Sequence, residues 1–150
     1  MTTKQLVRME TRGTWEGNLK TSIYAREFSP FIIDEPKHLG STNEGPNPLE
    51  YLLGGLTGCT SVMIGLIAKE QNFSYQGIEF KNSGIIDARG MRGVEGVSTY
   101  FQTVSFEAIF STDESDERLG ALKAEVERRC PIHNLIVDAG VAIDSKWYKN

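Results

Sequence analysis

The chain has little cysteine, no large excess of charge of one sign, and no long uninterrupted apolar run. Two cysteines among 150 residues are too few for a disulfide-stabilised scaffold. The 16 basic and 20 acidic residues give a net charge of −4, so no basic excess is available for nucleic-acid binding. No apolar run approaches the roughly 20 residues that span a bilayer, and the opening residues carry no apolar signal core. We therefore expect no membrane association and a cytoplasmic location.

The remaining composition is that of a globular protein. Apolar residues make up 39% and charged residues 24% of a chain whose length is typical of one domain. We therefore predict a single domain over residues 1–150. Proline and glycine divide the chain into three stretches.

The first stretch predicts three strands, over residues 5–12, 18–25 and 28–33. Turn residues Trp15-Glu16-Gly17-Asn18 join the first two strands into a hairpin, and Pro30 marks the third as an edge strand.

The second stretch predicts a long helix over about 48–71. Asn47 is a good N-cap, Pro48 suits the first helical position, and Glu50 stands where a capping-box carboxylate belongs. Charge is sparse along most of this helix, so we expect much of its circumference to be buried. Three glycines each lower helix propensity by roughly 1 kcal/mol, which indicates that another backbone passes very close. They are Gly54, Gly55 and Gly58.

The third stretch predicts two strands, two helices and a last strand. Their ranges are 75–88, 97–111, 113–129, 131–138 and 141–147, with a glycine-rich turn over 89–93. Two sets of apolar residues form the predicted core faces: Val104, Phe106, Ala108 and Phe110 on a strand, and Leu119, Leu122 and Val126 on a helix. The order β-β-β-α-β-β-α-α-β indicates an α+β fold with a largely antiparallel sheet.

The two cysteines are the candidate reactive groups. Cys59 lies on the apolar stripe of the long helix, and Cys130 precedes Pro131, where it can cap the following helix. A helix N-terminus stabilises a thiolate, which makes Cys130 the more acidic thiol by position alone. The alternatives are two buried inert thiols, a structural disulfide worth roughly 4 kcal/mol, or a zinc site using His38 and His133.

Two segments resemble the cysteine motifs of the OsmC/Ohr family of osmotically induced and organic hydroperoxide resistance proteins. The first is Gly45-Pro46-Asn47-Pro48-Leu49-Glu50-Tyr51-Leu52-Leu53-Gly54-Gly55-Leu56-Thr57-Gly58-Cys59, and the second is Arg129-Cys130-Pro131-Ile132-His133-Asn134. The resemblance extends over nearly the whole chain. It implies an α+β subunit with a long central helix, assembled into an intertwined homodimer.

The resemblance also implies an activity, which is the reduction of organic hydroperoxides to alcohols. It gives Cys59 the role of the attacking thiol and Cys130 that of the resolving thiol, joined in a disulfide that a dithiol such as a lipoyl group reduces. No metal, haem, flavin or other cofactor takes part. A thiolate must attack the peroxide, and a neighbouring arginine can lower its pKa.

Two further site residues follow from the resemblance. Glu50 can orient an arginine beside Cys59, although it also serves as a helix cap. Arg26 is the candidate arginine, chosen over Arg8 and Arg12 because it precedes the strand that leads toward Asn47. The alternative to a thiol peroxidase is a non-catalytic dimer of the same group that binds a small apolar ligand or senses redox state. A third reading is a structural interaction module.

Overall fold

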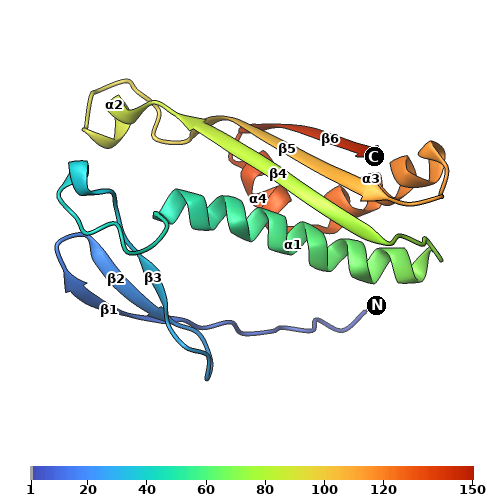
Figure 1. The fold of residues 1–150 in the computed structure, drawn as a ribbon, viewed down its shortest axis with the longest axis horizontal. Coiled ribbons are helices and arrows are strands. Elements are labelled where there is room, and N and C mark those ends of the chain that lie inside the picture. The colour runs from blue at the N-terminus through green and yellow to red at the C-terminus, as the bar shows by residue number, and fades with distance from the viewer. Residues whose placement is uncertain (1) are drawn as a thin grey trace. The chain divides into compact units, whose positions relative to one another are not determined.

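The computed structural model describes residues 2–150 and contains two compact units, one ending at Leu52 and one over Leu53–Asn150. The elements are β1 (Arg12–Gly17), β2 (Lys20–Tyr24), β3 (Phe31–Ile33), the 3-10 helix η1 (Lys37–Leu39), α1 (Pro48–Glu70), β4 (Gly77–Ile86), α2 (Ala88–Met91), β5 (Phe101–Ser111), α3 (Asp116–Arg129), α4 (Pro131–Asp138) and β6 (Ala142–Lys149) (Figure 1). This is an α+β fold, as predicted.

The first unit contains an antiparallel sheet in the order β1-β2-β3. The predicted strand over 5–12 is wrong, because the first strand begins only at Arg12 and includes Trp15. Gly17 and Asn18 both have positive φ values, of 106° and 48°, and this left-handed pair sets the hairpin turn later than predicted. The third strand is shorter than predicted but lies at the sheet edge, as Pro30 indicates.

A buried carboxylate organises the loop that leads to α1. Asp34 is fully buried and accepts hydrogen bonds from the hydroxyls of Ser41 and Thr42 and from the backbone N–H groups of Glu35 and Glu44. Burial alone raises the pKa of this carboxyl, but the four hydrogen bonds outweigh burial and hold its pKa well below the usual range. The ionised form of Asp34 therefore stabilises this loop.

Asp34→Asn is expected to destabilise the first unit at neutral pH. Because the folded pKa lies below the unfolded value of about 3.9, the ionised group stabilises the native state above that value and loses this effect as the pH falls. Thermal unfolding between pH 7 and pH 3 should show a steep loss of stability in the wild type and a shallower one in Asp34→Asn. The exposed Asp113 provides the control, Asp113→Asn, which should follow the wild type.

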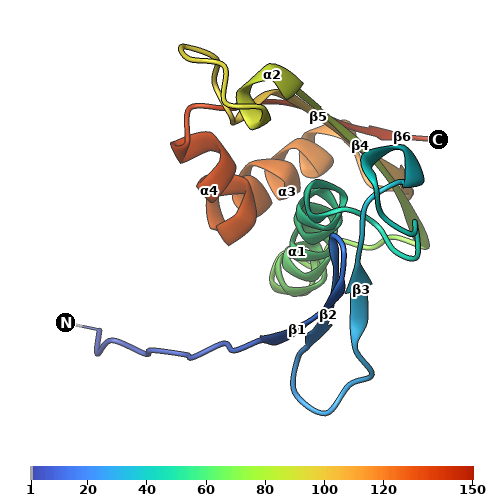
Figure 2. The ribbon, with the colours of Figure 1, turned by 90° about the vertical axis from the view of Figure 1, so that its left-hand side faces the viewer.

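The second unit contains a sheet in the order β4-β5-β6, with α1, α3 and α4 on one face (Figure 2). The pairing of β4 with β5 is antiparallel and that of β5 with β6 is parallel, so the sheets are largely antiparallel, as predicted. The predicted turn over 89–93 is instead mainly the short helix α2, because the Asp87 side chain caps it by accepting a hydrogen bond from the Arg89 N–H. The next helix begins after the Ser115 cap, three residues later than predicted.

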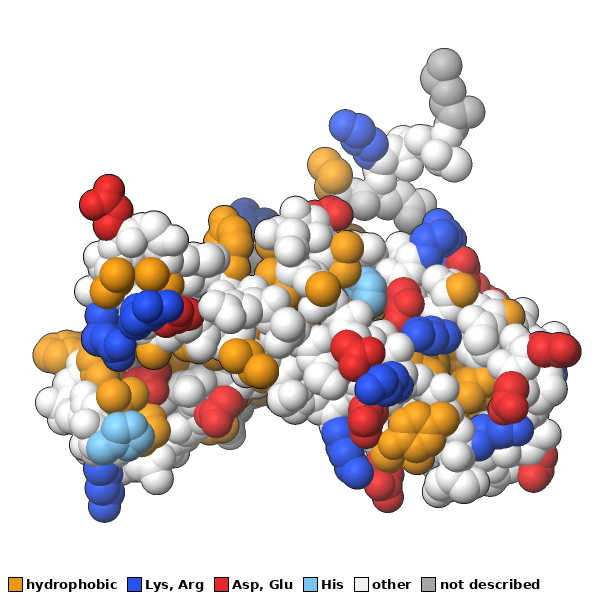
Figure 3. Space-filling view, turned by 90° about the horizontal axis from the view of Figure 1, so that it is seen from above, with side chains coloured by type: hydrophobic (Ala, Val, Ile, Leu, Met, Phe, Trp, Pro, Cys, Tyr) orange, Lys and Arg blue, Asp and Glu red, His pale blue; other side chains and the backbone are white. Residues whose placement is uncertain are grey.

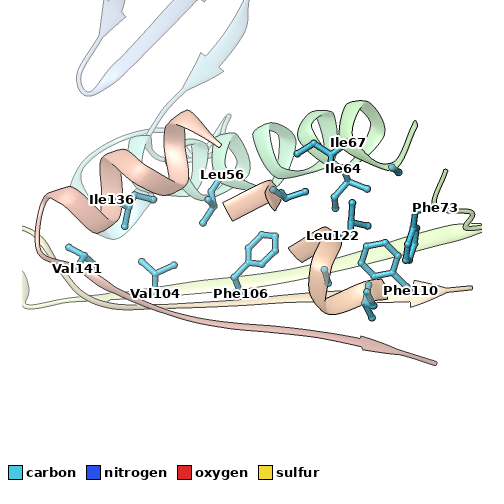
Figure 4. Close-up of a cluster of buried hydrophobic side chains, with 14 residues drawn as sticks. Leu56, Ile64, Ile67, Phe73, Val104, Phe106, Phe110, Leu122, Ile136 and Val141 are labelled. Atoms are coloured by element: carbon cyan, nitrogen blue, oxygen red, sulfur yellow. The ribbon is translucent and has the colours of Figure 1, made fainter. Parts of the chain in front are cut away.

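The core of this unit fills the space between the sheet and the helices (Figure 4). Both predicted core faces are confirmed, since every residue in each is buried. Phe110 is fully buried and its ring stacks on Trp147 of β6, with a centroid distance of 5.4 Å. This stacking fixes the indole at the inner face of the sheet.

Helix α1 buries one face only, which corrects the expectation of wide burial. Leu56, Thr60 and Ile64 lie on the buried face, whereas the residues Val62 and Leu66 are 62% and 53% exposed. By length and composition α1 is also apolar enough to cross a bilayer, which corrects the expectation that no segment of the chain is. The core helix of a soluble protein passes the same test.

The glycines of α1 face open space within the second unit. Apart from its chain neighbours and the backbone of α1 itself, a Cβ built on Gly54 or Gly58 meets no atom within 4 Å, and one on Gly55 meets only the tip of the Ile132 side chain at 3.4 Å. The expected close approach of another backbone is therefore not made by this unit. An apolar helix face that carries glycines remains uncovered there.

Candidate functional site

The second unit brings the two cysteines together. Cys59 lies in the middle of α1, and Cys130 lies at the junction between α3 and α4. The Cys130 thiol donates a hydrogen bond to the sulfur of Cys59 across an Sγ–Sγ distance of 3.1 Å. Both thiols are free; Cys130 is buried and Cys59 is half-buried. Residues 71 positions apart in the chain thus form one dithiol.

Local structure at the α3–α4 junction fixes Cys130. Cys130 is the C-cap of α3 and also the N-cap of α4, as predicted, with Pro131 at the first position of α4. The side-chain amide of Asn134 donates to the backbone carbonyls of Glu127, Arg128 and Cys130, at 2.9–3.1 Å. Asn134 thereby satisfies carbonyls that the end of α3 would otherwise leave unpaired. The Asn134 side chain thus helps to hold the junction in place.

The expectation that Cys130 is a more acidic thiol by its helix position is wrong. Burial raises the pKa of Cys130 above its ordinary value, and the neighbouring Cys59 raises it further. The backbone N–H groups of His133 and Ile132 act in the opposite direction, as expected of a helix N-terminus, but they do not compensate for burial. At neutral pH Cys130 is therefore a thiol that needs a proton acceptor before it can react.

The geometry suits dithiol–disulfide chemistry. A disulfide has an S–S bond of about 2.05 Å, so the two sulfurs need to approach by about 1 Å. A sulfenic acid formed on Cys59, the more exposed of the two sulfurs, would have a thiol in contact with it. Such contact favours condensation to a disulfide over further oxidation.

An ion pair made by the residue before Cys130 joins α3 to α1. The guanidinium of Arg129 lies 2.6 Å from the Glu70 carboxylate and 3.6 Å from that of Glu125. These contacts raise the pKa of Arg129 and lower the pKa of Glu70. The residue that precedes Cys130 is thus tied to the last turn of α1, which stabilises the approach of the two helices that carry the cysteines.

Glu50 and Arg26 both lie in the first unit. Glu50 forms the predicted capping box, since its carboxylate accepts from the Asn47 N–H at 2.8 Å and its own N–H donates to the Asn47 side chain at 2.9 Å. Arg26 has a positive φ of 50°, and its guanidinium lies over the ring of Phe28 at 4.6 Å. The cap is confirmed; the roles of Glu50 and Arg26 beside Cys59 remain predictions.

A small cavity lined by both polar and apolar residues adjoins Cys130, and the sequence pattern did not reveal it. Its volume is about 10 Å³, and its polar lining residues are Thr60, Glu127, Cys130, His133, Ser145 and Trp147. They come from α1, α3, α4 and β6, so only the folded chain brings them together. The single sequence signal was the position of Glu127 one helical turn before Cys130.

Charged side chains of both signs are mixed on one face of the molecule. On the face that Figure 3 shows, basic and acidic side chains are interspersed, and no large patch of one charge is visible. Within residues 2–150, no group of three or more His, Cys, Asp or Glu side chains is placed to hold a metal ion. The dithiol and its cavity are the candidate site of the second unit.

The comparisons with known proteins agree with this arrangement. The family model described as OsmC-like protein matches residues 41–146, which include both cysteines. No curated protein matches the chain. An OsmC-like protein from Mycoplasma pneumoniae has a similar fold, with a TM-score of 0.83 at 18% identity over 95% of this chain and 97% of that one.

Two other solved structures are named as organic hydroperoxide resistance proteins. The one from Legionella pneumophila has a TM-score of 0.75 at 17% identity and covers 97% of this chain and 99% of its own. OhrB of Bacillus subtilis has a TM-score of 0.65 at 20% identity, with 95% and 99% covered. At these identities the structures establish the fold alone, whereas the family model extends over more than half of the sequence. The chain therefore belongs to the OsmC-like protein family.

Proposed function

We propose that the protein is a thiol peroxidase that reduces organic hydroperoxides to alcohols. The observation that carries the proposal is the 3.1 Å contact between Cys59 and Cys130 in the reduced chain. Membership of the OsmC-like family supports it, as does the likeness to proteins named for organic hydroperoxide resistance.

The reaction proceeds in three balanced steps. The Cys59 thiolate attacks the outer peroxide oxygen, the O–O bond breaks, and the alkoxide takes up a proton and leaves as the alcohol. Cys130 then attacks the sulfur of the Cys59 sulfenic acid, which releases water and forms the disulfide. A dithiol reductant, such as a lipoyl group, then reduces this disulfide by thiol–disulfide exchange, which returns both cysteines to thiols and leaves the reductant as its own disulfide.

The two sulfurs have different exposure, which suits this division of roles. Cys59 is half-buried and open to a substrate, whereas Cys130 is buried behind it. Apolar residues of α1 flank Cys59, which favours an organic peroxide over hydrogen peroxide. Arg26, oriented by Glu50, is our proposed stabiliser of the Cys59 thiolate. A reducing compartment such as the cytoplasm would keep both thiols free.

We propose that the working form is a homodimer in which a second copy covers the exposed face of α1. Val62 and Leu66 are large apolar side chains left exposed on this face, and the Cβ positions of Gly54 and Gly58 are open within the second unit. A helix face with glycines allows close approach of another backbone, and two-fold dimers are the commonest assembly of soluble proteins.

Turnover with a dithiol tests the proposed activity. The protein, cumene hydroperoxide and dihydrolipoamide should together yield cumyl alcohol and oxidised lipoamide in equal amounts. Hydrogen peroxide at the same concentration should react at least tenfold more slowly. A rate no higher than that of dihydrolipoamide alone would contradict the proposed function.

A further inference from the structure

The cavity beside Cys130 contains buried polar atoms that the folded chain leaves without hydrogen bonds. Among residues 2–150, Glu127 Oε1, Ser145 Oγ and Trp147 Nε1 have no hydrogen-bond partner, and all three residues line this cavity. The nearest charge to Glu127 Oε1 is the ammonium of Lys123, at 3.9 Å. Buried polar atoms of this kind normally bind a partner, and a volume near 10 Å³ accommodates one water molecule.

The chemistry of these atoms defines how such a water would bind. The Trp147 indole N–H is a donor only, the ionised Glu127 carboxylate is an acceptor only, and the Ser145 hydroxyl can act as either. A water can accept from Trp147 while it donates to Glu127 and Ser145, and it can accept from the Cys130 thiol once that S–H turns away from Cys59 Sγ. All four positions around the oxygen would then be used.

The strand β6 holds two of these groups rigidly. Ser145 and Trp147 are opposite the buried residues Phe106 and Ala108 of β5, so they point to the inner face of the sheet. The Trp147 ring is stacked on Phe110, and the backbone carbonyl of Ser145 accepts a hydrogen bond from Lys123 at 2.7 Å. The Trp147 indole N–H and the Ser145 hydroxyl are therefore held by rigid neighbours beside the cavity.

We propose that this cavity binds one water that passes the proton of the Cys130 thiol to the Glu127 carboxylate as Cys130 attacks oxidised Cys59. The inference rests on the proposed function and adds a positioning and proton-accepting residue to it. In this step the Cys130 S–H bond and the Cys59 S–O bond break and the S–S bond forms. The thiol proton moves through the water to Glu127, the leaving hydroxide takes a proton from solvent, and Glu127 later returns its own proton to solvent.

The site needs such a proton acceptor. Burial raises the pKa of the Cys130 thiol, so the reactive thiolate is scarce at neutral pH. The other titratable groups around Cys130 and Glu127 are Cys59 from α1, Lys123 from α3 and His133 from α4. Of these, the imidazole of His133 is the other side chain that can accept a proton, so the experiment must separate His133 from Glu127.

The test measures the resolving step by itself. Reduced protein is mixed with one equivalent of cumene hydroperoxide, quenched with acid at successive times, and analysed by mass spectrometry for sulfenic acid and disulfide. With Glu127 as acceptor, the wild-type rate of disulfide formation should be nearly flat between pH 6 and pH 8. Glu127→Gln should lower that rate about 10²-fold at pH 7, and the rate should then rise tenfold per pH unit with the thiolate fraction.

Three further variants complete the test. Glu127→Asp should retain the flat profile, and His133→Gln should match the wild type. Trp147→Phe removes a donor to the water, so it should slow the step and keep the profile flat.

A wild-type rate and a flat pH profile of disulfide formation in Glu127→Gln would overturn the inference but leave the proposed peroxidase activity intact. A rate that rises tenfold per pH unit in His133→Gln would transfer the role of proton acceptor to His133. A wild type that forms neither sulfenic acid nor disulfide would overturn the proposed function and the inference together.

Discussion

Cys59→Ser is expected to abolish the reaction with organic hydroperoxide, whereas Cys130→Ser is expected to stop it after a single turnover. Cys59 is the half-buried sulfur that a substrate can reach, and Cys130 is buried in contact with it. Without the Cys130 thiol, oxidised Cys59 has no partner and should persist as sulfenic acid or become over-oxidised. The expected loss in Cys59→Ser is complete, since the one remaining cysteine, Cys130, is buried and its raised pKa leaves little thiolate.

The measurement is peroxide loss under single-turnover conditions with a sulfenic-acid trap. Cys130→Ser should consume one equivalent per chain and yield trapped Cys59, and Cys59→Ser should consume none. The opposite pattern would exchange the roles of the two sulfurs. Wild-type behaviour in both variants would show that neither thiol reacts and that both are inert core residues.

Gly58→Gln is expected to convert the protein from dimer to monomer while leaving the subunit folded. Gly58 is exposed on α1, and a Cβ built on it meets nothing within 4 Å in the second unit. In the isolated subunit glutamine should therefore be tolerated, and its higher helix propensity should stabilise α1 by roughly 0.5 kcal/mol. In a dimer that packs on this face, the added side chain would hold the second copy away.

Gly120→Gln is the matched control, because Gly120 is also an exposed helical glycine with nothing within 4 Å of its Cβ position, but it lies on α3. Light scattering at micromolar concentration should give twice the chain mass for the wild type and for Gly120→Gln. Gly58→Gln should give about the mass of one chain. A dimeric Gly58→Gln, or a monomeric wild type, would exclude the exposed face of α1 as the subunit interface.

The features that the sequence predicted well depend on neighbours in the chain. The capping box joins Asn47 to Glu50, three residues away, so its side chains meet whatever the rest of the fold does. The faces of β5 and α3 follow from the alternation and the helical period of their own residues. The first strand was misplaced because Gly17 and Asn18 set the turn by their left-handed backbone, which the strand pattern does not encode.

The candidate site was predicted only in part, for a similar reason. The two cysteines could be paired through their motifs, but the pKa of Cys130 depends on burial by other elements, and the helix position alone gave the wrong direction. The cavity that contains Glu127, Ser145 and Trp147 is formed by four separate elements. No periodicity in the sequence relates residues of β6 to residues of α3, so such a cluster becomes visible only in the structure.

Oxidation of the wild-type protein tests most directly the central claim that Cys59 and Cys130 form one redox-active pair. One equivalent of cumene hydroperoxide per chain, followed by alkylation and peptide mass spectrometry without reductant, should show that both thiols are lost together. The account predicts a single cross-linked peptide pair that contains Cys59 and Cys130 within one chain. Consumption of the peroxide with both cysteines still open to alkylation would contradict it.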